Sequence, residues 1–429
     1  MRDILVCLLV FGSLPFILRS PVNGVMMWVW ISVMNPHTQG WGFATSFPFA
    51  ALVAGATIFS MLVTREPKSV PWSPVTVVLL LFGAWMIVTL PFSLHFEQSV
   101  PLWSRVMKIL LMTFVVLALV KTRAQVERLL WVLALSLGFY GFKGGIFTIS
   151  SGGAYRVWGP EGTFIGDNNA IALALIMAIP LLYYLLTLTK RRLLRYLLLA
   201  TILLSALAAL GSYSRGGFVA IAAMGLFMVY KSRRRIAVGS ALLLAAPLLL
   251  LFMPQQWVSR MDTIDNYELD ASAQGRLNAW AMAYRLASDR LFGGGFEVYT
   301  PSVFAVYAPN PNAVHAAHSI YFQVLGEHGF IGLGLYLLLG ILTWRTARWI
   351  IRTASERSEF QWAGDMAMAI QTSLVGFMVG GAFLSLAYFD VPYYLLCALV
   401  VTRRLMENHI DEQAAAARAA GGTGAPIPA

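Results

Sequence analysis

The residues best suited to chemistry in this sequence are arginines and histidines that stand near glycine and serine. In "LGSYSRGGFVA" (Leu210–Ala220), Arg215 lies in a short polar stretch between two long apolar runs. The neighbouring Ser212, Ser214, Gly216 and Gly217 are expected to leave backbone N–H groups open, at the positive end of the helix expected to begin there. A planar guanidinium suits phosphate oxygens, so this corner predicts an anion site. The alternative is an arginine that extends to lipid headgroups.

The second stretch is "HAAHSIYFQVLGEHGFIGLGLYL", which holds three of the six histidines. His318 stands where the chain enters an apolar run. A helix N-terminus disfavours imidazolium, so we expect a neutral His318 that acts as a general base near pH 7. His315 is a second candidate for substrate contact. A metal site is less favoured, because no third ligand has suitable spacing, and a histidine at a membrane interface is the other alternative. Glu327 and His328 are expected to form a buried polar pair.

The third stretch is "GRLNAWAMAYRLASDRLFGGGF" (Gly275–Phe296), in which Arg276 is a candidate for anion binding. Arg260 and Arg285 are lesser candidates for substrate contact, and a solvated charge is the alternative for each. The stretch predicts a helix that lies on a membrane surface or caps a cavity. Its apolar residues that share one helical face are Leu277, Trp280, Ala281, Tyr284 and Leu291.

The fourth stretch is "YRVWGPEGTFIGDNNAIALAL" (Tyr155–Leu175), a polar segment rich in glycine. Arg156 and Asn168 are its candidates for substrate binding. It ends in Asp167-Asn168-Asn169, which are good capping residues, so capping of the next helix is the alternative role.

The composition places these residues in a membrane protein. Of 429 residues, 58% are hydrophobic and 12% are charged, and the mean hydropathy is +0.70. At about 20 residues per crossing, the chain has room for about a dozen helices, which predicts an all-α fold. The net charge of +11 would suggest nucleic acid in a soluble protein. Here basic residues mark cytoplasmic loops, so we expect no nucleic-acid partner. Cys7 and Cys397 lie in apolar runs and predict no disulfide framework.

Six basic clusters set the orientation of the predicted helices. A cluster follows every second apolar run, which places all six in the cytoplasm. The intervening segments, among them the corner with Arg215 and the long segment 254–317, then face the periplasm of a bacterium. The clusters are Arg65/Lys68, Lys121/Arg123/Arg128, Lys190/Arg191/Arg192/Arg195, Lys231/Arg233/Arg234/Arg235, Arg345/Arg348/Arg352/Arg357 and Arg403/Arg404.

This pattern divides the chain into four parts. Residues 1–253 form a transmembrane bundle of about ten helices, and 254–317 form a periplasmic loop with surface helices. Residues 318–404 form the C-terminal transmembrane helices, and 405–429 form a disordered cytoplasmic tail rich in alanine and glycine. Within residues 1–35 we favour one tilted helix, broken near Pro21, over two short crossings, which gives twelve spans with both ends inside.

Taken in order, these motifs resemble the O-antigen ligase and polymerase superfamily. The resemblance rests on "SRGG", then "GRLNAW" and "RLFGGGF", then "AHSIYFQVLGEHGFIGLGLYL", and it spans nearly the whole chain. It is best to O-antigen ligases. The segments "MMWVWISVMNPHTQGWGFA" and "VWGPEGTFIGDNNAIALAL" are similar to the O-glycosylation ligases linked to exosortase systems.

The resemblance implies a bundle of about twelve helices in the bacterial inner membrane, acting on glycans linked to undecaprenyl diphosphate at the periplasmic face. Arg215, Arg276 and His318 match the family's functional arginines and histidine. Ser319 departs from the family's asparagine after that histidine. The expected acceptor is lipid A-core, and the expected reaction is one inverting displacement with His318 as base and the arginines on the diphosphate. The long segment has no compact pair of acidic residues, so we expect no metal and no cofactor.

Three other functions stay open. An O-antigen polymerase would use a second lipid-linked repeat unit as acceptor, and a protein O-oligosaccharyl ligase would use a protein hydroxyl. From another class, a lipid or glycan transporter would need charges along a pathway and inverted repeats. We find few charges within the apolar runs and no convincing repeat, so an enzyme is favoured.

Overall fold

The computed structural model describes residues 2–231 and 271–419, with separate positions between 235 and 257. These residues form helices, turns and loops without a β-strand, so the predicted all-α fold is confirmed for this part of the chain. The elements are α1 (Arg2–Arg19), α2 (Pro21–Met34), η1 (Pro36–Gln39), η2 (Phe43–Thr45), α3 (Phe49–Val63), α4 (Pro74–Thr89), η3 (Leu90–Phe92), α5 (Phe96–Leu119), α6 (Arg123–Ser150), α7 (Asn168–Leu188), α8 (Arg192–Gly211), α9 (Arg215–Lys231), α12 (Ala271–Asp289), α13 (Pro301–Tyr307), α14 (Ile320–Glu356), η4 (Ser358–Phe360), α15 (Gln361–Gly381) and α16 (Asp390–Ala419).

Several of these helices have the length and composition of membrane spans. Six such spans are found among the described residues: α4 with η3, α5, α6, α7, α8 and α14. The shorter helices α2 and α3 are also apolar. The protein is therefore a multi-pass membrane protein. The total of about twelve crossings stays a prediction.

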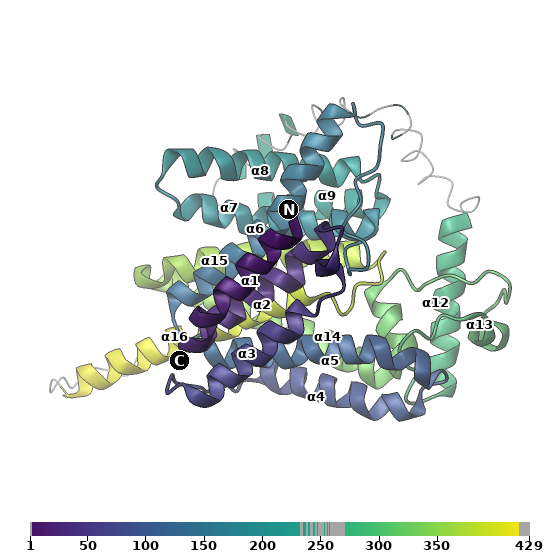
Figure 1. Ribbon diagram of the computed structural model, residues 1–429, viewed down its shortest axis with the longest axis horizontal. Helices are drawn as coiled ribbons and strands as arrows, with labels where there is room; N and C mark the ends of the chain where they lie inside the picture. The colour runs from purple at the N-terminus through teal and green to yellow at the C-terminus, as the bar shows by residue number, and fades with distance from the viewer. Residues whose placement is uncertain are drawn as a thin grey trace.

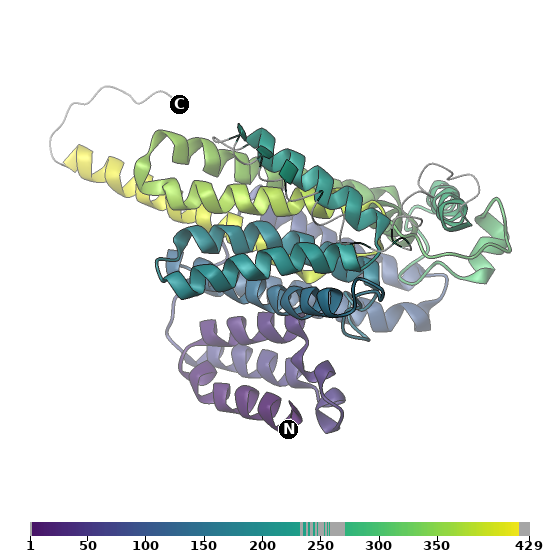
Figure 2. The ribbon, with the colours of Figure 1, turned by 90° about the horizontal axis from the view of Figure 1, so that it is seen from above.

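The bundle has two ends of different character. Figure 1 shows α12 and α13 at one end, which we call the loop end, and the C-terminal end of α16 at the other. Figure 2, seen from above, shows the same separation of the α12–α13 segment from the C-terminal end of α16. We call the opposite end the basic end, because several of the arginines and lysines of the predicted clusters meet there. Arg128 at the start of α6 lies 3.5 Å from the Asn23 side-chain oxygen, and Arg357 donates to Gln413 at 2.9 Å.

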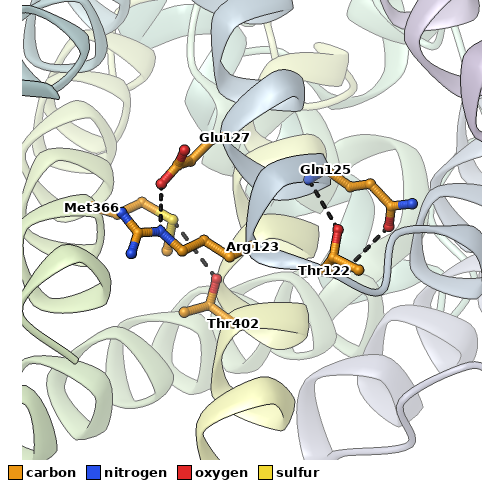
Figure 3. A network of polar contacts seen from close by, with 6 residues as sticks. All are labelled: Thr122, Arg123, Gln125, Glu127, Met366 and Thr402. Atoms are coloured by element: carbon orange, nitrogen blue, oxygen red, sulfur yellow. Dashed lines mark hydrogen bonds and ion pairs between the residues drawn. The ribbon is translucent and has the colours of Figure 1, made fainter. Parts of the chain in front are cut away.

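Local hydrogen bonds at the basic end fix where α6 begins (Figure 3). Thr122 caps the helix: its hydroxyl accepts from the Gln125 N–H, and the Gln125 side chain accepts from the Thr122 N–H. One residue on, Arg123 donates to Glu127 at 2.7 Å, one turn further along α6. Such a capping box uses two N–H groups that the first turn would otherwise leave without partners.

The expectation of one tilted helix over residues 1–35 is wrong. The chain forms α1 and α2 as separate antiparallel helices, with Pro21 as the first residue of the second. The Asp3 carboxylate, near the start of α1, accepts from the N–H groups of Gly42 and Ala44, which follow α2. Those contacts hold the start of α1 at the loop end. Proline supports a helix start at its first position, which the sequence pattern alone did not separate from a kink.

The segment from α12 to α14 packs around a small core of its own. Met282 and Leu286 on α12 are fully buried against Phe304 on α13. Leu277 and Tyr284, on the face predicted to meet a membrane, are 47% and 56% exposed. Figure 1 shows α12 standing across the direction of the bundle helices. The predicted surface helix is therefore present, although it ends at Asp289 rather than continuing to residue 296.

Candidate active site

Arg215 is the first residue of α9, at the loop end. The preceding Ser214 is buried, and its hydroxyl accepts from the Gly217 N–H at 3.0 Å, so it caps the helix. The Ser214 N–H donates to the Ser212 hydroxyl at 3.2 Å. The expectation that Ser214 and Gly217 leave their N–H groups open is therefore wrong, because the corner satisfies both internally. The charged group of this corner is the Arg215 guanidinium, on a side chain that is half-buried.

Gly216 lets this corner approach the loop between α15 and α16. A Cβ at Gly216 would lie 3.0 Å from the Cβ of Phe383 in that loop. Two residues later in the loop, the Ser385 hydroxyl accepts from the His318 N–H at 2.9 Å. One short loop thus touches both the Arg215 corner and the backbone of His318.

The start of α7 supports the corner from another side. Asp167 caps α7, its carboxylate accepting from the N–H groups of Asn169 and Ala170 at 2.8 and 3.0 Å. Asn168 is buried and donates its amide to the Ser212 carbonyl at 2.7 Å. Asn168, a predicted substrate contact, therefore holds the corner in place.

Arg276 lies in the second turn of α12, and its neighbour Gly275 is packed on His315. A Cβ at Gly275 would lie 2.2 Å from a ring carbon of His315, so only glycine admits the imidazole this close. Further along α12, Trp280 donates to the Ala317 carbonyl at 2.7 Å and stacks on Phe322 at 4.8 Å between ring centroids. These contacts fasten α12 to the residues before and after His318.

His318 has a backbone conformation that non-glycine residues seldom adopt, with φ of +41°. The next residue, Ser319, is extended and precedes α14. Such a conformation persists only where neighbouring contacts determine it, and it is frequent at functional sites. Here the bond to Ser385 and the contact of Trp280 with Ala317 supply that constraint.

Burial is the main cause that lowers the pKa of His318 below its usual value. The positive charge of Arg276 lowers it further, Asp167 raises it, and His315 lowers it. The imidazole is therefore neutral at neutral pH, as a general base must be. The same interactions show that Arg276, Asp167 and His315 lie within electrostatic reach of His318.

Two other predicted residues make contacts of their own. Arg285 lies nine residues after Arg276 on α12, which places it about 13 Å along the axis and on the opposite face. Its guanidinium reaches the Tyr307 carbonyl at 3.5 Å. Arg156 lies over the ring of Tyr213, two residues before Arg215, at 5.8 Å. Arg260 lies outside the described residues.

Glu327 and His328 are both buried, as predicted, and each bonds to a neighbouring segment. Glu327 accepts from the Tyr388 hydroxyl, in the same loop that contacts His318. His328 contacts the Thr89 hydroxyl at 2.9 Å, next to η3. Adjacent residues on one helix point to different neighbours, so each side chain binds a different segment.

A long apolar cavity of about 500 Å³ begins beside this cluster. Its lining comes from α14, α15 and α16 and runs from Ile320 and Tyr321 to Arg345 and Arg348. The chain bends at Gly329 between these residues, so both parts of α14 contribute to the lining. The cavity starts two residues after His318 and ends at one of the basic clusters.

The described residues contain no group of three or more His, Cys, Asp and Glu side chains that could hold a metal ion. Metal independence stays a prediction, to be tested by chelation.

Two family models match the chain. Residues 200–337 match the model described as O-antigen ligase, and this range contains Arg215, Arg276 and His318. This match places residues 200–337 in the O-antigen ligase superfamily. Residues 1–212 match a family of unknown function, DUF5935. A search of curated proteins found no match.

Membership in the O-antigen ligase superfamily implies a ligase activity of the glycosyltransferase kind, with a lipid-linked glycan and a lipid acceptor as substrates in general. The matched range carries the corner, α12 and the start of α14. The loop with Ser385 and the carboxylate of Asp167 lie outside it.

Two residues that contribute to the cluster were not predicted from the sequence. Asp167 was assigned capping alone, and nothing in its neighbourhood indicates that it lies close to His318, about 150 residues away. Ser385 stands in an apolar stretch with no motif. Both act through contacts between distant segments, which spacing along the chain does not reveal.

Proposed function

We propose that this protein is an O-antigen ligase that transfers a glycan from undecaprenyl diphosphate to lipid A-core at the periplasmic face of the inner membrane. The observation that carries the proposal is the position of His318 at the loop end: its N–H donates to Ser385, and Gly275, the neighbour of Arg276, packs on His315. A base beside a cation is what attack on a sugar diphosphate requires.

The proposed reaction is a single displacement. The acceptor hydroxyl loses its proton to His318 as its oxygen attacks the anomeric carbon. The bond from that carbon to the diphosphate oxygen breaks, and undecaprenyl diphosphate leaves with the electron pair. Arg215 and Arg276 stabilise the departing diphosphate, and the configuration at the anomeric carbon is inverted. The proton on His318 then passes to solvent.

The apolar cavity along α14 suits the polyprenyl chain of the donor. It begins at Ile320 and Tyr321, beside the residues proposed to hold the diphosphate, and most of its lining residues are apolar. A chain lying in it would place its diphosphate near His318. The cavity thus gives the donor an orientation, with the lipid toward the basic end and the sugar at the loop end.

The deciding experiment is transfer in vitro from purified lipid-linked glycan, by purified protein in lipid nanodiscs. Three acceptors are offered separately: lipid A-core, a second lipid-linked repeat unit, and a protein bearing free hydroxyls. Transfer to lipid A-core supports the ligase. Extension of the repeat unit would instead indicate a polymerase, and modification of the protein would indicate an O-oligosaccharyl ligase.

The same assay tests metal dependence. We expect transfer to continue at an unchanged rate in EDTA, because cationic side chains replace the metal on the leaving diphosphate. Loss of transfer in EDTA, followed by recovery on addition of Mg²⁺ or Mn²⁺, would contradict this expectation.

A further inference from the structure

A second cavity lies at the loop end, apart from the cluster around His318. Its volume is about 340 Å³. Its lining residues come from η1, α6, the 151–167 loop and α7, and all of them fall within the range matched by the family of unknown function. The lining residues are Thr38, Gln39, Tyr140, Lys143, Gly144, Phe147, Arg156, Val157, Trp158, Gly159, Pro160 and Ile171.

The charged residues that line this cavity are both cations, Lys143 and Arg156. Within the part of the chain that the structure describes, neither forms an ion pair with a carboxylate. Lys143 belongs to an apolar span and lies seven residues, or about 10 Å, before the end of α6. The Lys143 side chain is exposed and lines the cavity, and an ionisable residue in an apolar span is a candidate for function. Two uncompensated cations favour an anionic ligand.

The remaining walls suit a sugar. Tyr140, Phe147 and Trp158 supply aromatic faces, and the Trp158 side chain is 61% exposed. The wall is held by hydrogen bonds: Gln39 donates to the Tyr140 hydroxyl at 2.7 Å, and that hydroxyl donates to the Met34 carbonyl. Aromatic faces beside amide and cationic donors offer both stacking and hydrogen bonds to a ring that carries hydroxyls and a negative charge.

The cavity shares a wall with the corner that carries Arg215. The Val157 N–H donates to the Gly211 carbonyl at 3.0 Å, and Arg156 lies over Tyr213. The apolar cavity proposed for the donor lipid is built from other helices, α14 to α16. In an inverting displacement the acceptor approaches from the side opposite the leaving diphosphate. A second cavity, separate from the lipid cavity and adjoining the corner, is placed for the acceptor.

We propose that this cavity binds an anionic sugar of the acceptor, one that carries phosphate, through Lys143 and Arg156. This rests on the proposed transfer to a glycan acceptor. It assigns a role to the N-terminal region: residues 1–212 select the acceptor, whereas residues 200–337 carry the proposed chemistry.

The test measures binding without the donor, so it does not depend on catalysis. The probe is the soluble core oligosaccharide released from lipid A, with its phosphates intact or removed by phosphatase. Titration calorimetry uses the full chain in nanodiscs of phosphatidylcholine. We expect Lys143→Gln and Arg156→Gln each to weaken binding of the phosphorylated probe at least about tenfold, as loss of one charge-assisted contact predicts. Both variants should bind the dephosphorylated probe as the unmodified protein does.

Lys108→Gln is the matched control, since Lys108 is also an exposed lysine on an apolar helix but does not line the cavity. It should bind both probes normally. Equal binding of the phosphorylated probe by Lys143→Gln, Arg156→Gln and the unmodified protein would overturn the proposal.

A second arm separates the acceptor from a lipid headgroup. Nanodiscs containing phosphatidylglycerol should leave oligosaccharide binding unchanged at constant ionic strength. If the anionic lipid displaces the probe, and the two substitutions abolish that competition, the cavity is a headgroup site and the proposal is wrong. If the unmodified protein binds the probe but transfers no glycan to lipid A-core, the proposed function fails while the anionic-sugar site stands.

Discussion

At the scale of single residues, the proposed glycan transfer depends on His318 as the base that takes the proton of the acceptor hydroxyl. His318→Ala removes the base, which typically contributes about 10²- to 10⁴-fold in rate, and we expect a loss of kcat in that range. His318→Gln keeps a polar side chain of similar reach and should be as inactive, because glutamine cannot take the proton. Initial rates of glycan transfer in nanodiscs provide the measurement. Full activity in either variant would exclude His318 as the base.

The charges around His318 make a pH prediction with a definite sign. Transfer needs neutral imidazole, so kcat/KM should fall as the pH drops through a pKa lowered below its ordinary value. Arg276 lowers that pKa, so Arg276→Gln should move this acidic limb to higher pH, besides slowing the reaction. Asp167 raises it, so Asp167→Asn should move the limb to lower pH, and asparagine still caps α7.

Asp289→Asn is the control for these two variants, because Asp289 on α12 bonds to Tyr307 and is not among the charges that shift His318. Its pH profile should match that of the unmodified protein. If Arg276→Gln and Asp167→Asn displace the limb in the same direction, the assigned electrostatics are wrong.

At the scale of elements, close contact between α6 and α8 depends on glycine. A Cβ at Gly145 would lie 2.5 Å from the Leu204 carbonyl oxygen and 2.7 Å from its Cα. Backbone atoms cannot move aside cheaply, so Gly145→Ala should force the helices apart and destabilise the fold by roughly 1–3 kcal/mol. Thermal unfolding of the purified protein in detergent measures the loss.

Gly55→Ala on α3 is the matched substitution, because nothing lies within 4 Å of the Cβ it would add. It should leave the unfolding temperature unchanged or raise it slightly, since alanine favours a helix. Equal unfolding temperatures for Gly145→Ala and the unmodified protein would mean that α6 and α8 do not pack as closely as the structure has them.

The elements themselves were largely predictable, and their contacts were not. Apolar runs and basic clusters located α4 to α8 and α14, because burial in lipid demands long apolar segments. The break at Pro21 was misjudged, since proline both kinks helices and begins them. Ser214 was predicted to contact the substrate, whereas its hydroxyl caps α9. Local sequence identifies a residue able to hydrogen-bond but does not choose its partner.

At the scale of the whole molecule, the proposed site gathers segments that lie far apart in sequence. The loop near residue 385 contacts the start of α9 and the residue pair before α14. Asp167 before α7 and Arg276 on α12 lie within electrostatic reach of His318. Arg215, Arg276 and His318 were named from the sequence because each stands in a motif. The Ser385 and Asp167 contacts depend on how the bundle closes, which no local pattern records. The proposal thus has predicted residues at its centre and unpredicted ones as their support.

The two ends of the bundle give the last prediction, which concerns orientation. The start of α1 lies beside Gly42 and Ala44, which follow α2, whereas the later part of α16 extends beyond the basic end (Figure 2). Exposed positions at these places are Arg2, Val306 and His409. In a background with Cys7 replaced by serine, Arg2→Cys and Val306→Cys should react with an impermeant maleimide in cells whose outer membrane is permeabilised. His409→Cys should react only after the inner membrane is broken, because basic residues stay on the cytoplasmic side.

Two outcomes would contradict this prediction. If Arg2→Cys reacts under the same condition as His409→Cys, and Val306→Cys reacts under the other, α1 does not begin at the loop end. If His409→Cys alone reacts in cells with a permeabilised outer membrane, the protein has the opposite orientation. His318 would then face the cytoplasm, away from the proposed substrates.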